Sequence, residues 1–142
     1  MKQGDFLIAT PSIIGDFNFH RSCVLMVDVK ESGSIGFIVN KKLEYTLDDL
    51  MENISTPFPV FYGGPMEQDN LFYTHILGDL IPRSIKIDNN LFWSGDLPSV
   101  LDLLESGKLG QNQIRFFLGY SGWSKGQLKS EFEDKSWVIS DI

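Results

Sequence analysis

Short apolar runs separated by polar turn residues dominate the chain, a pattern that favours many short strands over long helices. The first part of the chain predicts strands at 6–9, 23–27 and 35–39. Residues 23–27 are apolar throughout, so we expect a central strand that is covered on both faces. The polar segment 30–34 predicts the turn of a hairpin that spans 23–39.

Two helices are predicted in the middle of the chain. Thr46 and the acids after it favour a helix start, but the apolar spacing lasts only to Met51, so this helix is short. Asp96 is expected to cap a longer helix that ends at Gly107, because apolar residues recur at helical spacing between them. Between the helices the pattern predicts a meander of short strands at 60–62, 71–76, 85–87 and 91–93.

The last part of the chain predicts a strand, a turn, a helix and a final strand. The first strand covers 113–118, and two glycines in 119–123 are expected to break it at a tight turn. Ser124 and Gln127 form a capping box, which predicts a helix that starts at Ser124. Residues 137–139 are the final strand. Because strands dominate and helices come singly, we expect one α+β domain over all 142 residues, with a mixed or antiparallel sheet rather than regular βαβ repeats.

Composition places the chain among globular proteins of single-domain size. Its 142 residues are 42% hydrophobic, 13% aromatic and 22% charged, which excludes the disordered, collagen-like and coiled-coil classes. Twelve Lys and Arg stand against nineteen Asp and Glu, for a net charge of −7. Because DNA binding depends on neutralising phosphates with clustered cations, we expect no nucleic-acid partner.

We predict that the protein has no useful affinity for duplex DNA at physiological salt. Lys41 and Lys42 are the only two cationic residues that are adjacent in the sequence. An anisotropy titration with duplex DNA at about 150 mM salt checks this expectation, and low-micromolar affinity would contradict it.

Cysteine content and hydropathy favour a soluble protein of a reducing compartment. Cys23 is the only cysteine, so no intramolecular disulfide can form. No segment has the apolar length of a signal peptide core or a membrane span, so we expect a cytoplasmic protein with no membrane partner. Cys23 begins an apolar run and is expected to be buried and unreactive.

The first candidate site is the predicted turn and the helix start that follows it. Gly119-Tyr120-Ser121-Gly122-Trp123 is close to the G-x-S-x-G motif of serine hydrolases, but Trp123 replaces the last glycine and both histidines precede the serine. We therefore disfavour serine-hydrolase chemistry. A glycine-rich turn that leads into a helix exposes the free N–H groups of the helix N-terminus. This arrangement favours the binding of an anion there, with Lys125 or Gln127 to orient it. The alternative is a structural turn with Trp123 packed in the core.

Three further candidates lie at or near strand ends. Gly63, Gly64 and Pro65 follow an apolar strand and form either a turn or a stretch of bare backbone that a ligand can approach. Asn40 ends a strand, where its side chain either bonds locally or lines a pocket. His75 lies among apolar neighbours in a strand, which favours a hydrogen-bonded structural histidine over a general base.

The sequence predicts no metal and no cofactor. Two histidines and one cysteine without ligand spacing argue against zinc, and neither glycine-rich nucleotide motif is present. No catalytic residue can be assigned. The candidate ligand-binding residues are Asn40, Gly63, Gly64, Pro65, His75, Gly119, Tyr120, Ser121, Gly122, Trp123, Lys125 and Gln127.

Several blocks of residues, taken together, carry a family resemblance. They are 8–11, 36–40, 63–66 and 117–123, the last followed by 126–128 and Glu131, with His75 after the third block. Over nearly the whole chain they resemble the YqgE/AlgH family of bacterial proteins.

The chain departs from the family pattern at two places. Lys41-Lys42 stands where Arg-Pro is usual, which makes the turn after Asn40 less rigid, and Asp28-Val29 stands where many members carry Glu-His. The resemblance implies an α+β fold whose bifurcated sheet is partly closed into a small barrel and flanked by helices. It implies no established reaction, since members are uncharacterised or carry a transcriptional-regulator label.

Two functions remain open at this level. We expect a protein that binds a small molecule or an anion at its glycine-rich loops, with Asn40, Gly64, His75 and segment 119–127 converging on one concave surface. The alternative is a regulatory protein that acts through contacts with a protein partner, using an aromatic surface without chemistry. A structure with the Gly63 and Gly64 loop far from 120–127 would exclude the first hypothesis.

Overall fold

The apolar runs of the sequence form the strands of one mixed sheet. The computed structural model describes residues 1–11, 19 and 21–140. The ten strands of this part of the chain are β1 (Phe6–Ala9), β2 (Cys23–Lys30), β3 (Gly33–Ile38), β4 (Lys42–Thr46), β5 (Pro59–Tyr62), β6 (Met66–His75), β7 (Ile85–Lys86), β8 (Phe92–Trp93), β9 (Ile114–Ser124) and β10 (Trp137–Ile139).

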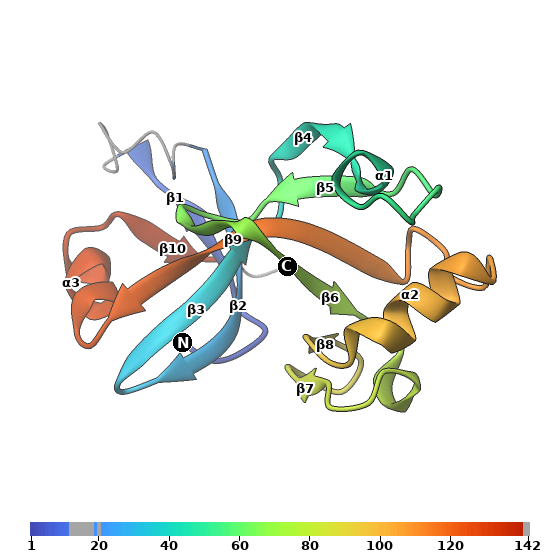
Figure 1. Cartoon of the computed structure of the whole chain (residues 1–142). Coiled ribbons are helices and arrows are strands. Elements are labelled where there is room, and N and C mark those ends of the chain that lie inside the picture. The colour runs from blue at the N-terminus through green and yellow to red at the C-terminus, as the bar shows by residue number, and fades with distance from the viewer. Residues whose placement is uncertain (12–18, 20, 141–142) are drawn as a thin grey trace.

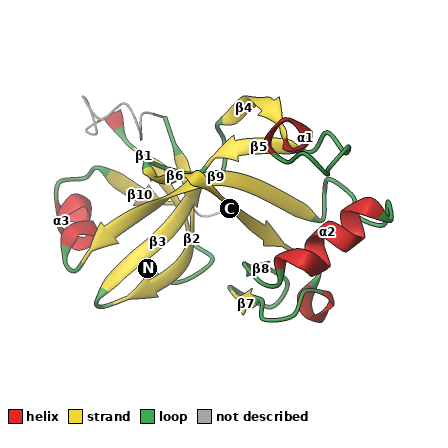
Figure 2. Ribbon diagram, in the orientation of Figure 1, coloured by secondary structure: helices red, strands yellow, loops and turns green. Residues whose placement is uncertain are grey.

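The described residues also form α1 (Leu47–Leu50), the single turn η2 (Gly78–Leu80), α2 (Leu97–Glu105) and α3 (Gln127–Glu133). Helix α2 has the predicted cap, because the side chain of Asp96 accepts the backbone N–H of Ser99 at 3.2 Å. Helix α1 is short, as expected, and the side chain of Asp49 accepts the N–H of Thr46 at 2.8 Å. Helices α2 and α3 lie at opposite sides of the molecule, and β9 runs from one side to the other (Figures 1 and 2).

The sheet divides along β9. The main strand order is β10-β1-β2-β3-β9-β6-β8-β7, and β5 pairs with both β9 and β4. In β9, residues 116–118 pair in parallel with β5, whereas residues 121–124 pair antiparallel with β3. All other described pairings are antiparallel. The fold is therefore the predicted α+β class with a mixed, mostly antiparallel, bifurcated sheet.

The sheet is not closed into a barrel. In the described part of the chain, β10 pairs only with β1, and β7 pairs only with β8. These two strands are the ends of the strand order, so the partial closure implied by the family resemblance is not found.

The predicted turn at 119–123 is wrong, because β9 continues through both glycines to Ser124. Gly119 has the expected positive φ of 75°, but the strand has partners on both sides of it: Leu118 pairs with β6, and Ser121 pairs with β3. Hydrogen bonding to these distant strands keeps the segment extended where local sequence predicts a break. Helix α3 then begins at Gln127 rather than Ser124, with Gly126 as the N-cap residue.

Other element boundaries also differ from the sequence-based expectations. Strand β4 was not predicted, and β6 begins at Met66, five residues before the predicted 71–76 strand. Half of the predicted capping box is present, since the Gln127 side chain accepts the N–H of Ser124 at 3.0 Å. Strand β4 has no continuous apolar run, and most of its residues are exposed. It is a strand because it pairs with β5, which the local sequence does not reveal.

Three apolar clusters fill the fold. One joins α2, through Val100, to the first half of β9. A second lies against α3 and contains Trp123 and Trp137, whose rings meet edge to face at 5.9 Å. The third contains Phe37 stacked on Phe117 at 4.8 Å. Its residue Leu25 alternates along β2 with Val24 and Met26 of the second cluster, so these two clusters lie on opposite faces of that strand.

Candidate functional site

Two of the candidate segments touch each other, backbone against backbone. A Cβ atom on Gly64 would lie 2.3 Å from the carbonyl of Tyr120, and one on Gly119 would lie 2.4 Å from the carbonyl oxygen of Gly64. The buried hydroxyl of Ser121 donates to the carbonyl of Gly63 at 3.1 Å. The glycines thus allow two chain segments to cross where the sheet divides, and protein rather than solvent covers their bare backbone.

Asn40 and Pro65 also have partners within the protein. The Asn40 carbonyl Oδ1 accepts the N–H of Cys23 at 2.9 Å, and its Nδ2 donates to the carbonyl of Arg21 at 3.0 Å. The carbonyl of Pro65 accepts Nε2 of Gln68 at 3.2 Å. Asn40 therefore joins the end of β3 to the start of β2, the local role that the sequence left as one of two alternatives.

His75 lies apart from the glycine crossing. It pairs with Ile114 at the beginning of β9, whereas Tyr120 pairs with Met66 near the other end of the β6–β9 ladder. The imidazole is buried: Nδ1 accepts the N–H of Leu77 at 3.2 Å, and Nε2 lies 2.9 Å from the hydroxyl of Ser84. The structure therefore does not bring His75 to the glycine crossing, and its contacts are those of a structural histidine.

We predict that His75 makes the stability of the protein fall in mild acid. Burial lowers the pKa of His75 below its ordinary value of 6.5, although the carbonyl of Ser94 opposes the shift. The unfolded chain therefore binds a proton more readily, and stability is lost as the pH falls from 6.5 toward the folded-state pKa. Urea unfolding at about pH 7.5 and about pH 5 should show a larger loss for the wild type than for His75→Gln. Equal losses would refute this role of His75.

Cys23 is half-buried rather than fully buried as predicted. It is the first residue of β2, and burial raises the pKa of its thiol. Less thiolate is then present at neutral pH than for a free cysteine, so we predict slow labelling by iodoacetamide in the native state and fast labelling in urea. Fast, stoichiometric labelling of the folded protein would contradict this expectation.

A groove lies over the second half of β9, where several candidate residues meet. The β3–β9 groove has a volume of about 670 Å³, and its lining includes Asp28, Ile35, Met66, Tyr120, Gly122 and Gln127. A Cβ atom on Gly122, which pairs with Ile35 of β3, would lie 3.3 Å from the Tyr120 ring, so the glycine lets this ring lie close to the backbone. Burial raises the pKa of the Tyr120 phenol, and the nearby Glu67 carboxylate raises it further. The phenol therefore stays a neutral hydrogen-bond donor.

A second groove adjoins the first at the tip of the β2–β3 hairpin. The lysine groove has a volume of about 420 Å³ and shares Lys30, Gly33, Ser34 and Ser124 with the β3–β9 groove. Lys125 and Lys129 also line it, together with Glu31. Lys30 pairs with Asp28 at 3.4 Å, whereas Lys125 and Lys129 make no ion pair with any described residue.

Gln127 is held by the protein, and the residue that holds it was not among the sequence-based candidates. Its Oε1 accepts the N–H of Ser124 at 3.0 Å, and its Nε2 donates to Glu131 at 3.0 Å. The carboxylate of Glu131 also accepts the indole N–H of Trp123 at 3.2 Å and that of Trp137 at 2.8 Å. Glu131 therefore holds in place two residues that line the β3–β9 groove, Trp123 and Gln127. A signal was present, since Glu131 belongs to the last block of the family resemblance.

In the part of the chain that the structure describes, no helix has the length and apolar character needed to cross a membrane. The same residues contain no group of three His, Cys, Asp or Glu side chains arranged to hold a metal ion.

Known proteins resemble the chain along its whole length. A family model described as AlgH-like matches residues 6–142. A UPF0301 protein of Chlorobaculum tepidum is 38% identical over 142 residues, which covers 99% of this chain and 75% of the relative. A UPF0301 protein of Bacteroides thetaiotaomicron is 39% identical over 141 residues, which covers 98% of this chain and 71% of the relative.

Two solved structures share the fold. The solution structure of AlgH from Pseudomonas aeruginosa matches with a TM-score of 0.80 and 26% identity, covering 99% of this chain and 77% of that chain. The crystal structure of a protein from Corynebacterium diphtheriae matches with a TM-score of 0.79 and 18% identity, covering 100% of this chain and 76% of that chain. At that identity the second match shows the fold alone. The match of the family model to nearly all residues, together with these relatives, shows that the chain belongs to the AlgH-like family.

Proposed function

We propose that the protein binds a small anionic molecule where the β3–β9 groove meets the lysine groove. One observation carries this proposal: Lys30 at the end of β2 lines the same groove as Lys125 and Lys129, which lie just before α3 and within it. The protein has a net charge of −7, so such a grouping of cations is not expected from composition. A local cluster of cations raises the concentration of small anions at its surface.

The residues around the lysines favour ligand contact over core packing. Lys125 and Lys129 are exposed and have no ion-pair partner in the described chain, so their ammonium groups are available to an anion. Gly33 and Ser34 add backbone and hydroxyl groups to the lining. Of the candidate residues from the sequence, this site uses Tyr120, Gly122, Trp123, Lys125 and Gln127. Gln127 contributes by holding the turn between β9 and α3 in place, because its side-chain oxygen already accepts the N–H of Ser124 and its side-chain nitrogen already donates to Glu131.

An NMR titration with inorganic phosphate and with citrate tests the proposal. Backbone amide signals of Gly33, Ser124 and Lys125 should shift in the wild type. The double variant Lys125→Gln, Lys129→Gln should bind about tenfold more weakly, because each exposed lysine–anion contact is worth up to about 1 kcal/mol. Lys108→Gln is the matched control, since Lys108 is exposed and comes three residues after the end of α2, a helix at the opposite side of the molecule from α3 (Figure 1). Equal affinities for the double variant and the control would overturn the proposal.

A regulatory role through protein contacts is supported by a different surface. Strand β10 is an end of the sheet, and its Val138 side chain is 51% exposed next to the exposed Ile8 of β1. An apolar, unpaired sheet edge is a common place for another chain to bind. Cross-linking in cell extract should capture a partner with the wild type but not with Val138→Lys. If the two capture the same proteins, this surface has no such role.

A further inference from the structure

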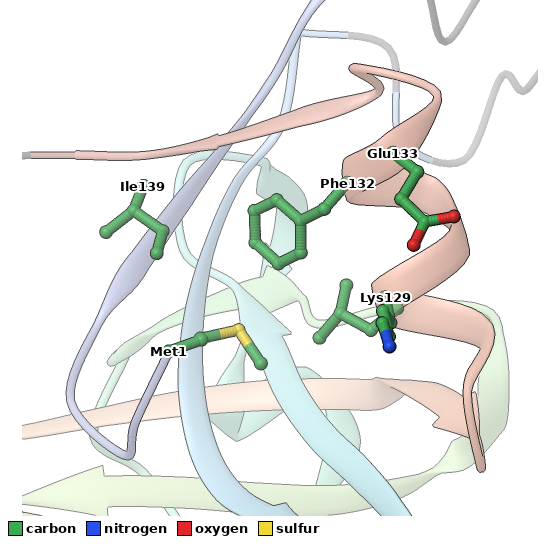
Figure 3. Close-up of a pocket in the computed structure, with 6 residues that line it drawn as sticks. Met1, Lys129, Phe132, Glu133 and Ile139 are labelled. Atoms are coloured by element: carbon green, nitrogen blue, oxygen red, sulfur yellow. The ribbon is translucent and has the colours of Figure 1, made fainter.

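An apolar groove opens between α3 and the end of β10. It has a volume of about 500 Å³ and is lined by Met1, Leu128, Lys129, Phe132, Glu133 and Ile139. Phe132 projects from α3 into the space between Ile139 and Met1 (Figure 3). None of the candidate residues from the sequence lines this groove. Apart from Lys129, none of the lysines of the proposed anion site lines it either.

The apolar groove and the lysine groove adjoin each other. Met1, Leu128 and Lys129 line both, so the two hollows meet beside α3. The side chain of Met1 is 43% exposed at this junction. The unbranched side chain of methionine is flexible, so Met1 can change conformation to let one molecule occupy both grooves. We refer to the two adjoining grooves together as the cleft.

Charge is distributed unevenly along this cleft. Lys30 and Lys125 line only the end next to the β2–β3 hairpin, and Lys129 lies where the two grooves meet. Glu133 lines only the apolar end, and Glu31 is the acid that lines the lysine end. A negatively charged group is therefore attracted more strongly to the lysine end, where three lysines stand against Glu31, than to the apolar end, where Lys129 and Glu133 offset each other. An apolar chain gains most from contact with Phe132 and Ile139, because it removes their exposed surface from water.

From this arrangement we infer that the cleft binds a free aliphatic carboxylic acid, with the carboxylate at Lys125 and Lys129 and the unbranched chain against Phe132 and Ile139. The inference rests on the proposed anion site, because the carboxylate occupies it, and it adds the class of ligand. Charge complementarity sets the orientation of the molecule. A polar anion without a chain would leave the apolar groove exposed to water, and an alcohol of the same length would leave the lysines without a partner.

Calorimetric titration with hexanoate, octanoate and decanoate, each below its micelle concentration, tests the inference. In the wild type the dissociation constant should fall up to about fourfold for each added methylene, until the apolar groove is filled. Decyltrimethylammonium has a comparable chain and the opposite charge, so it should bind at least tenfold more weakly than decanoate.

Two matched pairs of variants separate the chain from the head group. Ile139→Thr should reduce the gain per methylene, whereas Val138→Thr should not, because Val138 is the more exposed neighbour and does not line the groove. Lys125→Gln with Lys129→Gln should weaken all three acids by a similar factor, whereas Lys108→Gln should not. Circular dichroism confirms that each variant is folded.

The outcomes distinguish the two proposals. If the acids bind and respond to the lysine variants but show no dependence on chain length, the aliphatic ligand is excluded and the anion site stands. If affinity grows with chain length and responds to Ile139→Thr but not to the lysine variants, the anion site is excluded, and with it the inference that rests on it. If Val138→Thr and Ile139→Thr have equal effects, the chain does not occupy this groove.

Discussion

Replacing Gly119 with alanine should destabilise the protein by about 3–5 kcal/mol, a large part of the stability of a domain of this size. Gly119 has a φ of 75°, where an L-residue costs about 1–2 kcal/mol. The new methyl group would also lie 2.4 Å from the carbonyl oxygen of Gly64 and 2.9 Å from that of Met66. Both are backbone atoms, so relief requires the two crossing segments to separate.

Gly126 provides a matched control for this variant. Its φ of 78° is nearly that of Gly119, but a Cβ atom there has no neighbour within 4 Å. Gly126→Ala should therefore cost only the backbone contribution, about 1–2 kcal/mol. Urea denaturation of both variants measures the difference. Equal losses would mean that close approach at Gly119 contributes nothing to the division of the sheet.

Replacing Glu131 with alanine should destabilise the fold by about 2–4 kcal/mol and shift tryptophan fluorescence to the red. Its carboxylate accepts the indole N–H groups of Trp123 and Trp137, whose side chains are only 4% and 2% exposed. Without Glu131 both donors are buried and unpaired unless water enters the cluster. Entry of water lets the two indoles move toward a more polar environment.

Two further variants separate hydrogen bonding from charge. Glu131→Gln keeps an acceptor oxygen at nearly the same position, so it should lose less stability than Glu131→Ala. Glu133→Ala removes an exposed carboxylate from the same helix and should change stability by no more than about 0.5 kcal/mol. If Glu131→Ala and Glu133→Ala have the same stability and emission maximum, the indole hydrogen bonds have no structural role.

Local pattern determined most of the fold. The apolar run in β2, the spacing and caps of α2 and the short apolar strands could each be predicted from a few neighbouring residues. The predominance of strands was sufficient to predict the α+β class. In these elements the local preference and the tertiary contacts agree, and this agreement makes them predictable.

Segment 119–123 shows where local pattern is insufficient. Two glycines predict a break, yet pairing with β3 keeps the segment in β9 because its hydrogen-bond partners are far away in the sequence. From the sequence, Gly63, Gly64 and Gly119 are candidates either for tight turns or for ligand contact. Only the structure shows that they contact one another, so that their lack of side chains serves a chain crossing.

The residues of the candidate site also fall into those that the sequence suggests and those that only the structure adds. The sequence by itself suggested Lys125, Tyr120 and Gly122 as candidates, because a cation and glycines near a strand end can be recognised from neighbouring residues alone. Only the tertiary structure placed Lys30 beside Lys125 and opened the apolar groove between α3 and β10 next to them. A groove is formed by surfaces from separate elements, and its charge is the sum of residues that are distant in the chain. No local pattern encodes that sum, so the site becomes visible only after the strands and helices have packed.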